Sequence, residues 1–320
     1  MAKHKVGFWL YENGGGLAIQ KKFEEQLLER DIQVVPDLNL REASASSGTI
    51  LCNGVSMEEL SLYFSYNAGQ QTQYQIYLYD MVDRLIPVIN NFNSFALTED
   101  KFKTTHLLRQ HNIRTPDYRL CHRNDLDSLR LAMREWGGRA VYKPTDGWGG
   151  IGIVRLENEE SLDMLQPFLH QLDVPHFFVE RYIDNDNTDF RIDIVDGQFV
   201  GCYGRQAPKD HWKTNITSGG QVINREANDE VIDIALKAAA ATGLEIAGVD
   251  LLYDREHEEY VVLEVNGIPA FATPEQEANG LDFNNRKIEL IVDLIERLVQ
   301  HPDQRNHRQL TTSTNENTNA

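Results

Sequence analysis

The chain has 320 residues, of which 41% are hydrophobic and 25% are charged, and its formal net charge at pH 7 is -18. This length supports a sizeable core divided into two or three subdomains. The acidic balance argues against a general nucleic-acid-binding protein, whose contact surface is basic, but it allows a local cluster of Lys and Arg that binds a small anion.

The sequence predicts a cytoplasmic protein without a membrane segment. No apolar run approaches the ~20 residues of a membrane span, and the N-terminus MAKHKVGFWLY lacks the long apolar region and cleavage site of a signal peptide. The cysteines, Cys52, Cys121 and Cys202, are odd in number and widely spaced, which argues against a disulfide framework.

The N-terminal part of the chain predicts a βαβ unit. A buried strand over 5–11 precedes the run Gly14 to Gly16, which is followed by a helix over 17–30 and a second strand over 33–35. The glycines either form a plain tight turn or contact a ligand at the start of the helix. Further expected elements are a short strand over 49–52, a loop and helix over 63–79, and a last strand over 87–91.

The next helix is expected to begin at Thr98, a good N-cap residue, and to end near His111. Glu99 and Asp100 favour the positive end of the helix dipole, whereas Lys101 in the first turn is disfavoured there. Lys101 therefore either meets a negatively charged group such as a phosphate or is an ordinary solvated lysine.

Glycines dominate the seven residues PTDGWGG, which separate two expected strands over 139–143 and 151–156. Backbone N–H groups of a flexible glycine loop can close over phosphates, and Lys143 stands immediately before this loop. The loop is not a Walker motif, because neither a GK[ST] sequence nor a helix follows it. An ordinary hairpin turn does not need so many glycines, so we favour a phosphate-covering loop over a plain turn.

The rest of the chain alternates helical and extended patterns, with a polar loop over 206–221. The segment 301–320 is polar without periodicity and predicts a disordered tail. Helices are expected over 125–136, 161–172, 230–242 and 286–300, and strands over 177–183, 189–195 and 199–205, with Asp196-Gly197 as a hairpin turn.

Residues 248–271, GVDLLYDREHEEYVVLEVNGIPAF, predict two strands and a tight reversal. If the hairpin turns about His257, Asp250 lies opposite Glu264, and Asn266 points to the same side as Glu264. Two opposed carboxylates and an amide oxygen suit Mg²⁺, which binds through carboxylates, substrate phosphates and water. The alternative is a pair of ordinary solvent-facing acidic residues.

Taken in chain order, these features resemble the ATP-grasp superfamily. The resemblance covers about residues 90–300 and is greatest to the branch of the ribosomal-protein-S6 glutamate ligase (RimK-like), glutathione synthase and LysX. Each piece is weak alone, but the ordered set is specific. That set is Lys101 opening a helix, Lys143 before GWGGIG, the strand VERYI, the D-x-R pair Asp189 and Arg191, Arg205 followed by TN…GG, and VD…LEVN.

The resemblance implies an α/β (α+β) ATP-grasp fold with an N-terminal βαβ pre-ATP-grasp domain. It also implies ATP and Mg²⁺ as cofactors, with two ions in the site and Mn²⁺ as an alternative metal. The implied domains are the pre-ATP-grasp domain at 1–95, a central subdomain with the glycine-rich loop at 96–178, a C-terminal subdomain with the magnesium site at 179–300, and the tail at 301–320.

The site residues that the resemblance implies fall into four groups. Arg205 and Asn215 match positions near the transferred phosphate and the acyl group, and Asp250, Glu264 and Asn266 match magnesium ligands. Arg191 and Lys213 are candidates for binding an anionic substrate or are ordinary surface charges, and Gly219 and Gly220 complete the substrate group. The matches to ATP-binding positions are Lys101, Lys143, Gly147, Trp148, Gly149, Gly150, Glu180, Arg181, Tyr182, Ile183 and Asp189.

The implied reaction joins a carboxylate to an amine, such as that of glutamate, through an acylphosphate, and it releases ADP and phosphate. The carboxylate belongs to a small molecule or a peptide, nucleic acid and membrane are not partners, and a homo-oligomer is compatible with the family. Two alternatives stay open: a non-catalytic ATP-binding regulator with this fold, and an ATP-grasp kinase. Departures from the family pattern, such as the Lys-, His- and Trp-rich insert 208–213, concern the substrate more than the ATP chemistry.

Overall fold

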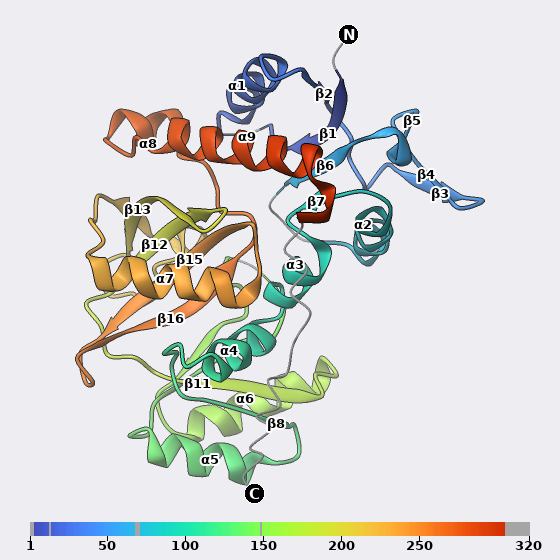
Figure 1. The fold of residues 1–320 in the computed structure, drawn as a ribbon. Helices are drawn as coiled ribbons and strands as arrows, with labels where there is room; N and C mark the ends of the chain where they lie inside the picture. The colour runs from blue at the N-terminus through green and yellow to red at the C-terminus, as the bar shows by residue number, and fades with distance from the viewer. Residues whose placement is uncertain (1–2, 13, 68–70, 148, 305–320) are drawn as a thin grey trace, which may run out of the picture.

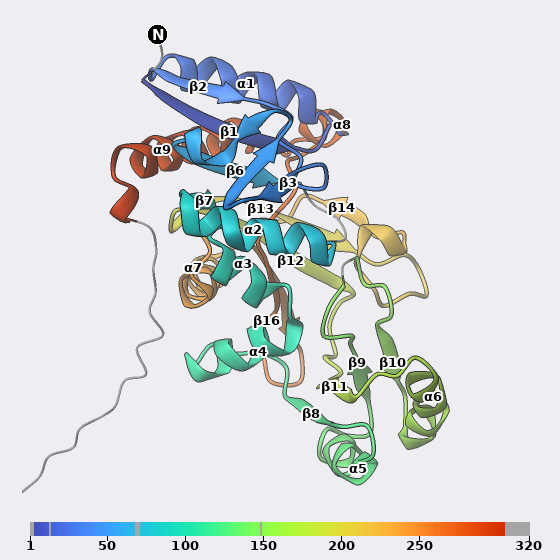
Figure 2. The ribbon, with the colours of Figure 1, turned by 90° about the vertical axis from the view of Figure 1, so that its right-hand side faces the viewer.

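The computed structural model describes residues 3–12, 14–67, 71–147 and 149–304. Three main sheets follow one another along the long direction of the molecule (Figures 1 and 2). A four-stranded sheet of the N-terminal residues lies at one end, a five-stranded sheet lies in the middle, and a second four-stranded sheet lies at the other end.

The N-terminal sheet has the strand order β2-β1-β6-β7, and all neighbouring strands pair in parallel. Helix α1 (Gly16–Leu28) connects β1 to β2, which confirms the predicted βαβ unit, and α2 (Gln73–Leu85) follows β6. The strands are β1 (His4–Leu10), β2 (Ile32–Val35), β6 (Leu62–Tyr66) and β7 (Val88–Ile89), and a small side sheet holds β3 (Ser44–Ser46), β4 (Thr49–Cys52) and β5 (Val55–Ser56).

Strand β6 corrects one expectation, because the start of the segment 63–79 forms a central strand and not a loop. All five residues of β6 are buried. A strand that is covered on both faces lacks the alternation of polar and apolar residues by which a half-exposed strand is recognised.

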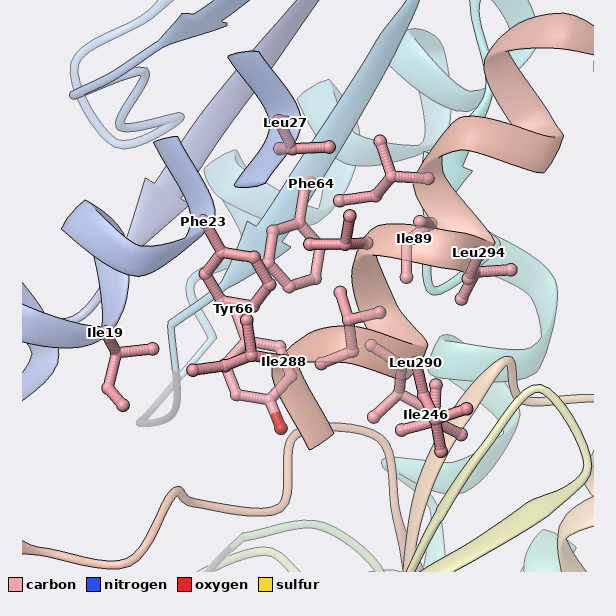
Figure 3. Close-up of a cluster of buried hydrophobic side chains, with 14 of the residues drawn as sticks. Ile19, Phe23, Leu27, Phe64, Tyr66, Ile89, Ile246, Ile288, Leu290 and Leu294 are labelled. Atoms are coloured by element: carbon pink, nitrogen blue, oxygen red, sulfur yellow. The ribbon is translucent and has the colours of Figure 1, made fainter. Parts of the chain in front are cut away.

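Helix α9 (Asn284–Gln300) packs against the N-terminal sheet although it comes from the other end of the chain. Figure 3 shows Ile288 and Leu294 of α9 in one apolar cluster with Phe23, Phe64 and the Tyr66 ring. Burial of one such side chain stabilises the fold by about 1.5–3 kcal/mol. The cluster therefore holds α9 against the N-terminal sheet.

The sheet at the far end is antiparallel and has the order β10-β9-β11-β8. Its helices α5 (Leu126–Glu135) and α6 (Glu159–Gln171) share a core with it that includes Met133, Leu162 and Phe177. The strands are β8 (Tyr118–His122), β9 (Ala140–Tyr142), β10 (Val154–Leu156) and β11 (His176–Arg181).

The helix expected to begin at Thr98 begins two residues later. Thr98 is the last residue of α3 (Phe92–Thr98), and its hydroxyl donates to the Ser94 carbonyl, 3.1 Å away. Asp100 is the N-cap of α4 (Lys101–Gln110), because its side chain accepts from the Lys103 N–H at 3.0 Å. The position of Lys101 in the first turn is confirmed.

The middle sheet is antiparallel with the order β14-β13-β12-β15-β16. Asp196 and Gly197 have φ values of 47° and 70° between β12 and β13, which confirms the predicted hairpin turn. The elements are β12 (Thr188–Val195), β13 (Gln198–Gln206), β14 (Gln221–Ile223), β15 (Ile246–Asp254), β16 (Glu259–Asn266), α7 (Asp229–Thr242) and α8 (Pro274–Ala278).

Asp250 lies opposite Glu264 in the β15–β16 hairpin, as predicted. However, Asp254 pairs with Glu259, so the centre of the turn lies between Glu256 and His257 and not at His257. A bulge between Asp250 and Leu251 shifts the register by one residue and brings the two carboxylates opposite each other.

Beyond α9, Pro302–Gln304 form a short 3-10 turn, and the remainder of the predicted tail, 305–320, lies outside the described residues. Within the part of the chain that the structure describes, no helix is both long and apolar enough to cross a membrane.

Candidate functional site

A cavity of about 830 Å³ is lined by residues from both antiparallel sheets and from the loop after β13. The apolar part of its lining includes Val141, Ile153, Ile183, Leu252 and Leu263. The rest of the lining holds most of the charged and polar residues that the sequence predicted. These are Lys101, Lys143, Glu180, Arg181, Tyr182, Asp189, Arg205, Lys213, Asn215, Asp250 and Glu264.

The two predicted lysines enter this cavity from different elements. Lys101, the first residue of α4, donates to the Gly147 carbonyl, and its Nζ lies 3.6 Å from Oε1 of Glu264. Lys143 follows β9, and its Nζ lies 2.5 Å from Oε2 of the buried Glu180. The other oxygen of Glu180 is buried without a hydrogen-bond partner among the described residues. The carboxylate of Glu180 thus holds Lys143 through one of its oxygens.

The glycine loop adopts a backbone that only glycine tolerates easily. Gly147, Gly149 and Gly150 have φ values of 95°, 66° and 74°. A Cβ on Gly150 would lie 2.6 Å from Oδ1 of Asn215. Trp148, predicted to contact ATP, lies outside the described residues.

Two side chains of the polar loop over 206–221 donate hydrogen bonds to backbone carbonyls of the glycine loop. Lys213 Nζ donates to the Gly150 carbonyl at 3.2 Å, and the Thr217 hydroxyl donates to the Gly149 carbonyl. Burial lowers the pKa of Lys213. Lys213 and Asn215 line this cavity, whereas the predicted ATP-binding residues Gly147 and Gly149 line a second one.

Asp250 lies between two arginines. Arg191, which pairs with it across β12 and β15, donates from Nη2 to Oδ2 at 3.0 Å and also from Nε to Oδ1. Arg205 Nη2 lies 2.8 Å from Oδ2 of Asp250. Burial raises the pKa of Asp250, but the attraction of Arg191 and Arg205 outweighs it and holds this pKa below its usual value. Asp250 is therefore an anion in this site.

Arg205 is fixed in turn by Asp189. Its Nε donates to Oδ1 of Asp189 at 3.0 Å, its Nη2 donates to Oδ2 at 2.7 Å, and its backbone N–H donates to Oδ1 at 3.1 Å. The Thr214 hydroxyl donates to the same carboxylate. Asp189 is therefore engaged by the protein itself, and it orients the guanidinium of Arg205 toward the cavity.

Asp250, Glu264 and Asn266 form a set of hard oxygen donors at one end of the β15–β16 hairpin. Asp250 pairs with Glu264, and Gly248 pairs with Asn266, so the two side chains from β16 share a face. Asn266 Nδ2 donates to the Gly248 carbonyl at 3.4 Å, which leaves its amide oxygen available. Two carboxylates and one amide oxygen fit the ligand chemistry of Mg²⁺.

Glu180, Arg181, Tyr182 and Ile183 run along the cavity between β11 and the middle sheet. Arg181 points to the hairpin turn, where it pairs with the carboxylates of Asp254 and, at 3.3 Å, Glu256. Within the described residues, those two acids and His257 form the one group of three His, Cys, Asp or Glu side chains whose ligand atoms lie close enough together to hold a metal ion. The guanidinium of Arg181 already offsets part of the negative charge of this group.

Three of the predicted substrate residues lie outside the set that lines this cavity, as far as the structure describes the chain. Arg191 is held on Asp250. Gly219 caps the short 3-10 turn Ile216–Ser218 with a φ of 87°, and a Cβ on Gly220 would lie 2.0 Å from the Thr214 carbonyl oxygen. Both glycines therefore shape the loop that carries Lys213 and Asn215.

Several residues of this cavity were not predicted from the sequence, and Trp212 is the largest of them. Its ring lies 6.2 Å from the Tyr182 ring, and the Arg155 guanidinium lies 5.8 Å from its centroid. The unusual composition of the insert 208–213 was the available signal. Leu252 and Leu263 were not predicted because an apolar residue in a strand gives no sign of which cavity it faces.

A second cavity of about 580 Å³ adjoins the first and shares Lys101 and Glu264 with it. Its other walls come from the glycine loop, from Thr98 and Glu99, and from the segment Asn266 to Ile268. Glu264 and Lys101 therefore line both cavities.

Comparisons with known proteins agree with this arrangement. A family model described as a RimK-like ATP-grasp domain matches residues 98–291. The chain is 28% identical over 253 residues to a tetrahydromethanopterin:alpha-L-glutamate ligase of Methanocaldococcus jannaschii, covering 77% of this chain and 81% of that protein. It is 27% identical over 290 residues to a ribosomal protein bS6–L-glutamate ligase of Salmonella paratyphi B, covering 83% and 94%.

The fold is also similar to a solved structure of the ATP-grasp ligase PsnB complexed with a phosphomimetic variant of a minimal precursor, Mg and ADP. The TM-score is 0.64 at 18% identity, and the match covers 91% of this chain and 98% of PsnB.

Proposed function

The chain belongs to the RimK-like ATP-grasp family, and we propose that it is an ATP-dependent ligase that joins a carboxylate to the amine of an amino acid such as glutamate. The observation that carries this proposal is the convergence of Lys101, Lys143 and Arg205 with Asp250 and Glu264 around one partly apolar cavity. Three cations suit a triphosphate, and two carboxylates suit its metal ion.

In the proposed complex the apolar wall, which includes Val141, Ile183 and Leu263, receives the adenine ring. Backbone groups between Glu180 and Ile183 hold the edge of the base. Lys101 and Lys143 bind the phosphates, and the N–H groups of the glycine loop cover them. The contacts of Lys213 and Thr217 with that loop support this closed arrangement.

Asp250, Glu264 and Asn266 would hold Mg²⁺, and the ADP- and Mg-bound PsnB complex supports both ligands for this fold. When bound, Mg²⁺ neutralises negative charge on the phosphoryl oxygens. We further propose that two ions bind and that Mn²⁺ can replace Mg²⁺.

The proposed reaction has two steps. An oxygen of the substrate carboxylate attacks the γ-phosphorus, the bond from that phosphorus to the β-phosphate oxygen breaks, and ADP leaves. The amine nitrogen then attacks the acyl carbon of the acylphosphate, phosphate leaves, and the nitrogen loses a proton to give the amide. Arg205, with Asn215 beside it, stabilises the charge on the transferred group or on the tetrahedral oxyanion.

The substrates enter through the second cavity in this proposal, because it meets the first at Glu264 and Lys101. The related ligases named for glutamate and for ribosomal protein bS6 support an amino-acid amine and a small-molecule or peptide carboxylate. Lys213 and Arg191 are our candidates for contacts with an anionic substrate, and Gly219 and Gly220 shape the loop that carries Lys213.

The experiment is a screen for ADP release in the presence of ATP and Mg²⁺ with pooled amino acids and pooled carboxylates, followed by mass analysis of the products. The proposal predicts a product mass equal to acid plus amine minus water. A phosphorylated product without a new amide would instead identify a kinase. Tight ATP binding with no ADP from any pool would move the assignment to a nucleotide-binding regulator.

A further inference from the structure

Lys287 is a lysine at a fully buried position of α9, with 0% of its surface exposed. Its ammonium donates to Oδ2 of Asp193 at 2.8 Å, to the Pro269 carbonyl at 2.7 Å and to the Ala270 carbonyl at 3.1 Å. An ammonium has three N–H donors, so all of them are used. The ring centroid of Phe271 lies 4.6 Å from the same nitrogen. This is a built cation site, in which every contact is intramolecular.

Two of these acceptors belong to the segment 267–271, which directly follows the proposed metal ligand Asn266 and which we call the strap. Several other side chains also hold the strap. Asn90 Nδ2 donates to the Gly267 carbonyl at 2.6 Å, the Tyr66 hydroxyl donates to the Pro269 carbonyl, and the Phe271 N–H donates to the Tyr11 hydroxyl at 3.0 Å. The strap is therefore fixed between the N-terminal sheet and α9.

The third acceptor connects the strap to the other side of the metal site. Asp193 lies two residues after Arg191 on the same face of β12, and Arg191 holds Asp250. At Gly248, which pairs with Asn266, a Cβ would lie 2.7 Å from Cβ of Pro269 and 3.1 Å from Nη1 of Arg191. The strap and Arg191 thus both lie close to the same face of Gly248, and Lys287 connects the strap to Asp193 on the strand that carries Arg191.

A role in stability alone explains this arrangement poorly. Two buried charges lose their hydration, and well-packed apolar residues often stabilise a core as well or better. The other oxygen of Asp193 is buried without a hydrogen-bond partner among the described residues. Burial also lowers the pKa of Lys287, although Asp193 opposes this change. The lysine instead fixes the positions of two backbone carbonyls and one carboxylate relative to one another.

We propose that Lys287 is a positioning residue of the ligase, which sets the distance between Asn266 on the strap and Asp250 on β15 and so prepares the site for Mg²⁺. This inference rests on the proposed function. Residues that orient metal ligands without touching the metal typically change metal affinity by about 10- to 100-fold when they are replaced.

The test uses the double variant Lys287→Met with Asp193→Asn, which removes both charges and leaves no buried ion unpaired. ADP binding is measured by calorimetry without metal and at increasing Mg²⁺ concentration. We expect metal-free ADP affinity to stay within about twofold and the Mg²⁺ concentration for half-maximal binding to rise by about tenfold. In turnover, the same shift appears as a higher Mg²⁺ requirement at an unchanged KM for ATP.

The matched control is Arg297→Met on the same helix. Its ion pair with Asp196, at 2.6 Å, joins α9 to the β12–β13 turn but involves no strap residue. This variant is expected to keep the wild-type Mg²⁺ dependence.

If the double variant fails to fold, Tyr66→Phe replaces it, because this change removes only the hydroxyl that donates to the Pro269 carbonyl. A smaller shift in the same direction is then expected.

A folded double variant, or in its place a folded Tyr66→Phe variant, with wild-type Mg²⁺ dependence would overturn the positioning role. This outcome is distinct from failure of the proposed function, because Mg²⁺-dependent ADP binding needs no acid or amine. A wild-type protein that binds ADP and Mg²⁺ but forms no amide would remove the ligase assignment alone.

Discussion

At the scale of residues, the site depends on charges that alternate along one face of β12. Asp189, Arg191 and Asp193 point to the same side, and each pairs with an opposite charge from a neighbouring element. Arg205 and Lys287 are two of these partners, and Asp250 is the third. Each charge in this row is therefore paired within the protein, and we propose that Lys101, Lys143 and a metal ion balance the triphosphate together with Arg205.

The variants Lys143→Ala and Glu264→Gln test the proposed roles of Lys143 in phosphate binding and of Glu264 in metal binding. Each is expected to lower the rate of ADP formation by at least about 100-fold, because each removes charge that stabilises the transferred phosphoryl group or its metal ion. Lys237→Ala is the control, since Lys237 is an exposed lysine of α7 paired with Asp233. Wild-type turnover by Lys143→Ala and Glu264→Gln would show that the site is elsewhere.

Gly150→Ala tests the contact between the glycine loop and Asn215. The new Cβ meets Asn215 at 2.6 Å in a backbone with a φ of 74°, so the loop and Asn215 have to move apart. We expect KM for ATP to rise by about tenfold, the equivalent of 1.4 kcal/mol. Gly48→Ala carries the same kind of strain at a φ of 86° without a neighbour within 4 Å. It should leave KM unchanged, and equal kinetics for both variants would contradict the proposed loop contact.

At the scale of elements, the junction between β7, α3 and β15 contains a buried acid. Glu245 accepts hydrogen bonds from the Asn91 backbone at 2.9 Å and from the Asn91 side chain. Burial raises the pKa of Glu245 from 4.5 to about 7, these hydrogen bonds oppose the change, and Asp83 adds to it. Folding therefore takes up a proton at this group between those two values.

The free energy of unfolding is expected to fall as the pH rises from 5 to 8, with a contribution from Glu245 on the order of 3 kcal/mol. The sign follows from the raised pKa, since the proton favours the folded chain and is lost as the pH passes through about 7. Urea unfolding of Glu245→Gln at both pH values should show a smaller decrease than the wild type. An identical decrease in both proteins would assign the pH dependence to other groups.

The sequence predicted most elements that show a clear period or turn signal. The β15–β16 pairing of Asp250 with Glu264 was correct, although the bulge that produces it has no sequence signature. Strand β6 was not predicted, because its residues are buried on both faces and show no alternation of polar and apolar side chains. The pairing of Arg191 with Asp250 and the burial of Lys287 arise from contacts between distant segments, which local patterns cannot specify.

At the scale of the whole molecule, the cavity joins parts of the chain that otherwise have separate cores. Lys143 belongs with the β8–β11 sheet, whereas Arg205 and Glu264 belong to the middle sheet. Helix α9 in turn ties the middle sheet to the N-terminal sheet through Lys287 and its apolar face. We propose that the predicted divisions at 1–95, 96–178 and 179–300 correspond to these three parts, except that α9 packs on the N-terminal sheet and that Leu108 of α4 belongs to the core of the middle sheet. ATP would then act as a link between two of them.

Thermal unfolding with a non-hydrolysable ATP analogue and Mg²⁺ tests this linkage. At 100 times its dissociation constant, the analogue should stabilise the folded chain by about 2.7 kcal/mol. Lys143→Ala should lose most of this gain at the same analogue concentration, while Lys237→Ala should keep it. Equal stabilisation of all three proteins would place the nucleotide away from the cavity.

The most direct test of the central claim follows the oxygen atoms of the acid. With the acid identified by product mass, its carboxylate is labelled with oxygen-18 and the released phosphate is analysed by mass. Activation by ATP through an acylphosphate predicts that one labelled oxygen of the acid appears in the phosphate for each amide formed. Unlabelled phosphate, or phosphate that stays on the product, would contradict the ligase mechanism.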